Sequence, residues 1–134
     1  MKKVFPAVLS ELANVLAFTD SELEKAGCPI KTQTSVDVAL EELFVNVASY
    51  AYPDGNGTAE IEVIADESER YVSVRISDSG LEFDPMAKPD PDTTLKANER
   101  QIGGLGIYMV KKMMDDIRYS YSDGLNILTV VKKR

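Results

Sequence analysis

The feature that most restricts the fold of this chain is a stripe of apolar side chains at helical spacing in its first half. The stripe follows Thr34 and recurs at steps of three and four residues: Val36, Leu40, Leu43, Val47 and Tyr50. A run of turn-forming residues, 53–57, comes directly after it. This pattern predicts an amphipathic helix that ends before Pro53. Such a helix has to cover its apolar face with another layer of structure.

Two further segments carry apolar residues at helical spacing. The first lies within residues 4–26 and is ended by Gly27-Cys28-Pro29, with apolar positions at Val8, Leu9, Leu12, Val15, Leu16 and Leu23. The second follows a cluster of glycines near residue 105, with apolar positions at Ile107, Tyr108, Val110, Met113, Met114 and Ile117. We therefore predict one helix near each end of the chain in addition to the central one.

Alternating apolar and polar residues predict two hairpins. The first joins strands over 58–65 and 70–77, and the second joins strands over 117–121 and 126–131 through the turn Ser122-Asp123-Gly124. Strands that follow one another through short turns pair antiparallel. The predicted fold is an α/β (α+β) two-layer sandwich, in which three helices cover one face of a largely antiparallel, mixed sheet.

Between the two hairpins the periodic pattern disappears. The segment from Leu81 to Gln101 holds Pro85, Pro89 and Pro91 and few residues to bury, so it is predicted to be a long loop. Long loops in compact domains are usually functional lids or disordered segments. No repeat or linker divides the chain, and we expect a single domain over residues 1–134.

Charge and missing residue types exclude several functions. The formal net charge of −7 opposes a protein that grips a nucleic-acid backbone, because that task needs clustered Lys and Arg. The chain has no histidine, which excludes a Ser-His-Asp triad and a histidine-based zinc site. A single cysteine, Cys28, fits a reducing compartment. No segment approaches the ~20 apolar residues of a membrane span, so we expect a cytoplasmic protein that contacts neither nucleic acid nor membrane.

Glu42 and Asn46 are the first candidate site residues. They stand four residues apart on the central helix, one above the other at the edge of the apolar stripe. A carboxylate and an amide directed into one cavity could act as general base and Mg²⁺ ligand. Alternatively, Glu42 is a solvated helix residue and Asn46 a polar filler.

Two glycine-containing stretches complete the set of candidates. Gly103-Gly104-Leu105-Gly106 opens a helix, where unpaired N–H groups favour a phosphate, although the same glycines could be a hinge. Asp78 and Gly80 end a predicted strand in the stretch "ISDSGLEFDP". There the carboxylate could accept a ligand hydrogen bond beside a bare backbone, or the two residues could form an ordinary turn.

Taken in order, these motifs resemble the Bergerat-type (GHKL) ATP-binding fold of histidine kinases and type II topoisomerases. Within that superfamily, "DSGLEFDP" and "GGLGIYMVKKMMD" are similar to the bacterial anti-sigma factor serine-protein kinases. The resemblance covers about residues 34–131. It implies one histidine-kinase-like ATPase domain with a flexible ATP lid at about 81–103, and ATP and Mg²⁺ as cofactors.

The resemblance also implies roles for individual residues. Glu42 matches the catalytic base, Asn46 the nucleotide-site Mg²⁺ ligand, Asp78 the acceptor of the adenine amino group, and Gly80 the glycine against which the base packs. The helix-opening residues Gly103, Gly104, Leu105 and Gly106 match the phosphate-binding end of the lid. Arg100 is implied as a γ-phosphate partner, and Thr129 as a residue near the adenine and its aspartate. The chain departs from the superfamily pattern at Glu82, where a second glycine is usual.

The function implied is that of an anti-sigma regulatory factor. Such a protein sequesters a sigma factor and phosphorylates a Ser or Thr on a STAS-type anti-anti-sigma antagonist, and a homodimer is a family expectation. Two alternatives stay open at this point. One is a non-catalytic nucleotide-binding module in a partner-switching pathway, and the other is a protein with no nucleotide site.

Overall fold

Five strands form a single sheet in the order β1-β2-β3-β5-β4 in the computed structural model, which describes residues 1–65, 69–87 and 104–134. The strands are β1 (Lys2–Pro6), β2 (Thr58–Ile64), β3 (Tyr71–Asp78), β4 (Asp116–Ser122) and β5 (Leu125–Lys133). Each pairing within the described residues is antiparallel. Both predicted hairpins are present, so the expected antiparallel sheet is confirmed.

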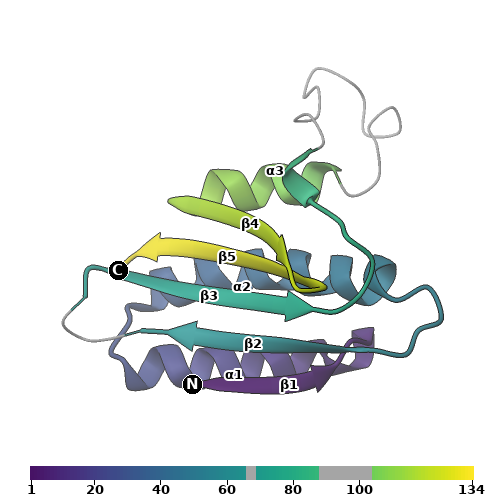
Figure 1. Ribbon diagram of the computed structural model, residues 1–134. Coiled ribbons are helices and arrows are strands. Elements are labelled where there is room, and N and C mark those ends of the chain that lie inside the picture. Colours follow the sequence, from purple (N-terminus) through teal and green to yellow (C-terminus); the bar gives the residue numbers. More distant parts are fainter. Residues whose placement is uncertain (66–68, 88–103) are drawn as a thin grey trace.

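In the described part of the chain, three α-helices cover one face of this sheet (Figure 1). They are α1 (Leu12–Lys25), α2 (Ile30–Asn46) and α3 (Gly104–Met113). Of the three short helical turns in the described residues, η1 (Leu9–Glu11) precedes α1, η2 (Val47–Ala51) continues α2, and η3 (Pro85–Ala87) follows β3. The predicted two-layer fold class is confirmed. Among the described residues, no helix is both long and apolar enough to span a bilayer.

The first segment of the chain differs from the prediction. Residues 4–26 were expected to form one helix, but Lys2–Pro6 pairs with β2 as an edge strand and α1 begins only at Leu12. Val4 and Phe5 of this strand face opposite sides of the sheet, as shown by their exposed fractions of 55% and 3%. A strand with one inward-facing side chain leaves too short an alternation to be recognised in the sequence.

The central helix is longer than predicted at its start and ends in a different geometry. It begins at Ile30, because the carbonyl of Pro29 accepts the first helical hydrogen bond from Gln33 N at 3.0 Å. After Asn46 the helix continues as the π-helical turn η2, Val47–Ala51. A π-helical turn widens the backbone and is often found beside functional sites.

The core lies between α1, α2, α3 and the inner face of the sheet. Three residues of the apolar stripe on α2, Val36, Leu40 and Leu43, are buried in it, whereas Val47 is half-buried and Tyr50 is 51% exposed. The sheet contributes alternate residues of β2, β3 and β5: Ala59, Ile61, Val63, Val72, Val74, Ile76, Leu128 and Val130. This burial places the C-terminal end of α2 over the end of β3, where the candidate residues lie.

Candidate functional site

Asp78 is the last residue of β3 and is 7% exposed. Its Oδ1 accepts two hydrogen bonds, from Gly80 N at 2.9 Å and from Asn126 Nδ2 at 3.0 Å. Within the described residues, Oδ2 receives no hydrogen bond. One carboxylate oxygen is therefore held by the protein, and the other is left to accept a hydrogen bond from another group.

Asp78 lines a cavity of about 40 Å³ between the end of α2 and the inner face of the sheet. Its walls are mostly apolar and come from four parts of the chain: Leu43, Val47, Tyr50, Ala51, Ile76, Leu81, Phe83, Pro85, Tyr119 and Leu128, with Asn46 and Asn126 as further polar members. An apolar slot with a few fixed polar groups suits a flat heteroaromatic ring. Ligand pockets are usually about 300 to 1,000 Å³, so we expect this cavity to widen when a base enters.

The chain that leaves β3, residues 81–85, forms one wall of the cavity through Leu81, Phe83 and Pro85. We call this segment the cover. Leu81 N donates to the carbonyl of Ala51 at 2.9 Å, and the ring of Phe83 lies 6.4 Å from that of Tyr50. The segment then turns into η3, where Asp84 Oδ1 accepts from Met86 N at 2.9 Å as a helix cap does. Leu81 is 57% exposed and Phe83 36%, which leaves both side chains only partly packed.

Gly80 lies where two parts of the backbone meet. A Cβ at this position would be 2.2 Å from the carbonyl oxygen of Ala51 in η2. A residue without a side chain is therefore required for the chain to pass the end of the π-helical turn. The expectation that Gly80 also packs against an adenine ring stays a prediction.

Glu42 and Asn46 lie on the same side of α2, one turn apart. Both are half-buried, whereas the neighbouring Glu41 is exposed. Asn46 lines the cavity, and the carboxylate of Glu42 lies against α3, because a Cβ at Gly106 would be 2.2 Å from Glu42 Oε2. The site thus extends along α2 from the cavity to the first turn of α3.

Gly104 and Leu105 are the first two residues of α3, as the glycine-rich stretch predicted. The N-terminal turn of a helix has free N–H groups, which suit a negatively charged ligand. Arg100 and Gly103 fall outside the described residues, as does most of the lid expected over 81–103. Glu82, the departure from the family pattern, is exposed on the cover.

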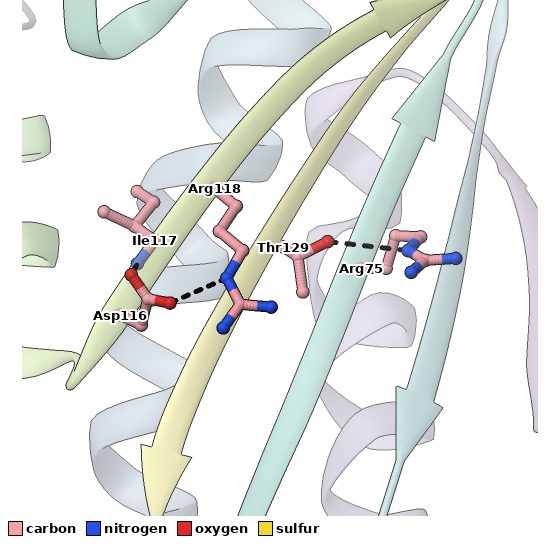
Figure 2. Close-up of polar contacts among 5 residues, drawn as sticks. All are labelled: Arg75, Asp116, Ile117, Arg118 and Thr129. Carbon is pink, nitrogen blue, oxygen red and sulfur yellow. Dashed lines mark hydrogen bonds and ion pairs between the residues drawn. The ribbon is translucent and has the colours of Figure 1, made fainter.

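Thr129 is placed differently from the expectation. Figure 2 shows it beside Arg75, whose Nε donates to Thr129 Oγ1 at 3.4 Å. Its other cross-strand neighbour, Arg118, is paired with Asp116 at 2.7 Å. Because side chains alternate along a strand and Leu128 is buried, Thr129 faces the side of the sheet away from the helices. The prediction that Thr129 lies near Asp78 is therefore wrong.

Asn126 is a site residue that the sequence argument did not identify. It lies opposite Asp78 in the β3–β5 pairing and is 6% exposed. The available signal was the alternation of side chains along a strand. Asn126 is two residues from Leu128 and four from Val130, so all three face the helices. A polar residue at an inward-facing strand position needs partners, and here it finds them around Asp78.

Tyr119 of β4 also reaches this cluster. Its hydroxyl donates to Asn126 Oδ1 at 2.5 Å. Burial is the main cause that raises the pKa of Tyr119, and the nearby carboxylates of Glu82, Asp84 and Asp78 raise it further. The phenol therefore keeps its proton at neutral pH and acts as a donor.

The oxygens of Glu42 and Asn46 are the groups at this site that fit a magnesium ion, since Mg²⁺ prefers a small number of oxygen ligands together with substrate phosphates. The described residues contain no group of three acidic, cysteine or histidine side chains that could hold a metal by themselves. Any divalent ion at this site would depend on phosphate oxygens for much of its coordination.

Comparison with known sequences gives a consistent set of relatives. Residues 5–132 match the family described as the histidine kinase-like ATPase domain. The chain is 28% identical over 111 residues to the serine-protein kinase RsbW of Listeria monocytogenes, an alignment that covers 78% of this chain and 68% of the relative. It is also 28% identical over 96 residues to the serine/threonine-protein kinase BtrW of Bordetella bronchiseptica, with 72% and 67% covered.

Solved structures with the same fold include two of particular interest. The RsbU and RsbW domains of Rv1364c from Mycobacterium tuberculosis match with a TM-score of 0.61 and 14% identity over 99% of this chain, which spans only 32% of that chain. The histidine kinase domain of Erythrobacter litoralis EL346 matches with a TM-score of 0.56 and 13% identity, covering 91% of this chain and 60% of that one. At these identities the matches establish the fold alone.

Proposed function

The chain belongs to the histidine kinase-like ATPase domain family, and on this premise we propose that it binds ATP with Mg²⁺ and transfers the γ-phosphoryl group to a Ser or Thr of a partner protein. The observation that carries the proposal is the buried Asp78 beside an apolar cavity, with one carboxylate oxygen held and the other accepting no hydrogen bond from the described part of the chain. The similarity to proteins named serine-protein kinases supports the transfer step.

Base binding rests on Asp78 and the walls of the cavity. Oδ2 of Asp78 accepts a hydrogen bond from the exocyclic amino group of adenine, while apolar side chains such as Val47 and Leu128 cover the two faces of the ring. Entry of the base displaces the cover, which includes Leu81 and Phe83. Gly80 holds the end of β3 close to η2 throughout.

Phosphoryl transfer rests on the other end of the site. Glu42 accepts the proton of the acceptor hydroxyl as its oxygen attacks the γ-phosphorus, and the bond from that phosphorus to the β-phosphate oxygen breaks to release ADP. The free N–H groups of the first turn of α3, together with Gly103 and Arg100 before it, stabilise charge on the phosphates. Asn46 holds the Mg²⁺ ion, which when bound neutralises part of the phosphate charge.

The partners follow from the resemblance to anti-sigma factor kinases. We propose that the phosphorylated protein is a STAS-type anti-anti-sigma factor and that the unphosphorylated antagonist competes with a sigma factor for this chain. The same resemblance supports a homodimer, a cytoplasmic location and a lid over about residues 81–103. The acidic chain, with its net charge of −7, contacts the transcription machinery through proteins rather than through DNA.

The test is phosphate transfer to a candidate antagonist. The purified chain is incubated with Mg-ATP and a STAS-domain protein encoded near it, and the antagonist is followed by intact mass for one added phosphate. Glu42→Gln should lower the rate by about 100-fold or more, as expected for loss of a general base. Glu41→Gln is the matched control, because that side chain is exposed on the same helix. Equal rates for parent and Glu42→Gln would contradict the assignment.

A second function is favoured by the small size of the cavity. Since the cavity is about 40 Å³ and Leu81, Phe83 and Pro85 form part of its wall, we expect nucleotide binding to rearrange residues 81–85. A ligand that stabilises one arrangement of that surface alters affinity for a partner without any transfer. Nucleotide binding with no added phosphate on the antagonist would favour this non-catalytic module, and no thermal shift with ADP or ATP would exclude both functions.

A further inference from the structure

Asn126 is the most fully connected polar side chain at the site, and nothing in the proposed function uses it. It comes from β5, lies directly opposite Asp78 of β3, and is 6% exposed. Removing a polar amide from water costs free energy unless hydrogen bonds replace the lost hydration. The arrangement of those hydrogen bonds indicates what the residue does.

All the hydrogen-bonding positions of Asn126 are occupied by protein groups. Its amino group donates to Asp78 Oδ1 at 3.0 Å and to the carbonyl of Leu81 at 2.8 Å. Its Oδ1 accepts from Phe83 N at 3.1 Å and from the hydroxyl of Tyr119 at 2.5 Å. A carboxamide has two N–H donors and two acceptor lone pairs, so no position remains for a ligand while residues 81–83 keep these contacts. Asn126 therefore acts on the site through its neighbours.

The first of these neighbours is the Asp78 carboxylate. Oδ1 receives one N–H from Asn126 and another from Gly80, and this pair of donors fixes which oxygen is turned toward the protein. Oδ2, which has no hydrogen bond within the described residues, is thereby left as an acceptor alone. An exocyclic amino group, as in adenine, matches an acceptor, whereas the carbonyl oxygen that guanine carries at the equivalent position is repelled by it.

The second neighbour is the cover of the cavity. The same amide holds Leu81 through its carbonyl and Phe83 through its N–H. We expect these residues to move when a base enters. One side chain thus links the orientation of the carboxylate to the position of the cover.

We propose that Asn126 is a positioning residue that gives the site its preference for adenine over guanine nucleotides by fixing the Asp78 carboxylate. Until a base enters, the same side chain also holds residues 81–83 beside that carboxylate. This inference rests on the proposed function, because it presupposes that the cavity takes a base. It assigns the role expected of Thr129 to a different residue on the same strand.

The proposal explains why an amide is needed at this position. In Asn126→Asp a carboxylate oxygen replaces the amino group, 3.0 Å from Asp78 Oδ1 and 2.8 Å from the carbonyl of Leu81. Two carboxylates so close together cannot both ionise without strong repulsion, and one of the two pKa values rises. The carboxylates of Glu82 and Asp84 lie near Tyr119, the residue that donates to Asn126, and their negative charge acts in the same direction. A proton bound at lower pH restores a donor between residues 126 and 78.

The experiment measures ATP and GTP affinities by calorimetry at pH 8 and pH 6 with non-hydrolysable analogues. In Asn126→Asp we expect the ratio of ATP to GTP affinity to fall by about tenfold at pH 8, equivalent to one hydrogen bond, and to recover in part at pH 6. The matched control is Asn14→Asp, the same change at an exposed position on α1. It should leave the ratio as in the parent at both pH values.

A second variant covers the case in which Asn126→Asp does not fold. Tyr119→Phe keeps the ring and removes one of the two donors that orient the amide, and we expect the affinity ratio to fall by about threefold to tenfold. Loss of packing alone lowers both affinities together and leaves their ratio unchanged. The ratio thus separates positioning from a purely structural role.

The outcomes distinguish failure of the proposed function from failure of the role given to Asn126. If the parent binds neither nucleotide, the proposed function fails and this inference fails with it. If the parent prefers ATP and Asp78→Asn loses that preference, while Tyr119→Phe and any folded Asn126→Asp keep the parent's ratio at both pH values, the role of Asn126 is overturned and the proposed function stands. A fall in the ratio that is reversed at lower pH in Asn126→Asp supports the role of Asn126.

Discussion

Gly106 of α3 lies directly against the carboxylate of Glu42 on α2, so close that a Cβ at residue 106 would be 2.2 Å from Glu42 Oε2. The proposed base and the turn of helix that would face the phosphates are therefore in contact in this fold. The two residues are 64 positions apart in the printed sequence, and packing of α3 against α2 brings them together.

Replacing Gly106 with Ala should lower activity more than stability. The added methyl group has to displace the end of the Glu42 side chain, which is flexible enough to move at little cost in folding. A displaced base loses alignment with the acceptor hydroxyl, and we expect the transfer rate to fall by about tenfold to 100-fold. The rate and the melting temperature are measured together, with Met109→Ala on the exposed side of α3 as the control. A transfer rate equal to that of the parent would argue against Glu42 as the base.

Replacing Gly80 with Ala should, in contrast to the change at Gly106, have a large effect on stability. The new Cβ would be 2.2 Å from the carbonyl oxygen of Ala51 and 2.7 Å from its Cβ, and a backbone carbonyl in a helical turn cannot move as a long side chain does. We expect the free energy of unfolding to fall by about 1 to 3 kcal/mol, as in other overpacked sites. Urea denaturation measures it, and Ser79→Ala, at an exposed neighbouring position, is the control.

A pair of carboxylates between α1 and α2 should make stability depend on pH. Burial is the first cause that raises the pKa of Asp37 to about 7, and a hydrogen bond to Asp20 and the charge of Asp20 add to it. In each residue, Oδ1 is buried without a hydrogen-bond partner among the described residues. Because the pKa is higher in the folded protein than the ordinary value of 3.8, folding favours the protonated form. The stabilisation is complete below about pH 4 and is lost as the pH rises through about 7.

Asp37→Asn removes this dependence, since an amide stays neutral throughout. Relative to the parent, we expect the variant to gain stability between pH 5 and pH 8, by on the order of 1 kcal/mol, because partial exposure screens the repulsion. Urea denaturation at the two pH values tests this, with Glu24→Gln on the exposed side of α1 as the control. If the stability difference between variant and parent were the same at pH 5 and pH 8, the raised pKa of Asp37 would be ruled out.

The sequence was most informative where a long periodic pattern coincides with burial. Val36, Leu40 and Leu43 predicted α2 correctly, and the turn at Asp123-Gly124 predicted the β4–β5 hairpin, where both residues have positive φ. The edge strand β1 was missed, because a short strand at the edge of a sheet leaves only one buried side chain as a signal.

The site was predicted less completely than the fold, for a physical reason. Glu42 and Asn46 share a helix, so their spacing alone predicted that they lie on one side of it. Thr129 was assigned by the family resemblance, which places a threonine on the last strand, but a shift of one residue along a strand turns a side chain to the other face of the sheet. Asn126 acquires its partners from β3, β4 and the cover, and no local pattern reports contacts that depend on strand pairing and a loop together.

Asp78→Asn provides a sharp test of the whole site, because its neighbours determine how the new amide is oriented. The N–H groups of Gly80 and Asn126 both point at the position of Oδ1, so the oxygen of the new amide takes that position and its amino group takes the position of Oδ2. The site then offers a donor where it previously offered an acceptor. We expect ATP affinity to fall by about tenfold to 100-fold while GTP, with an acceptor oxygen, loses less.

Calorimetric titration with both nucleotides measures the change, and Asp123→Asn is the matched control because it lies in the β4–β5 turn at a φ of 52° that Asn also tolerates. The Asp78→Asn protein should keep a melting temperature close to that of the parent, since both hydrogen bonds to the position of Oδ1 are retained. An unchanged preference for ATP in a folded Asp78→Asn protein would mean that this carboxylate does not contact the base, and the position of the nucleotide would have to be sought elsewhere on the helical side of the sheet.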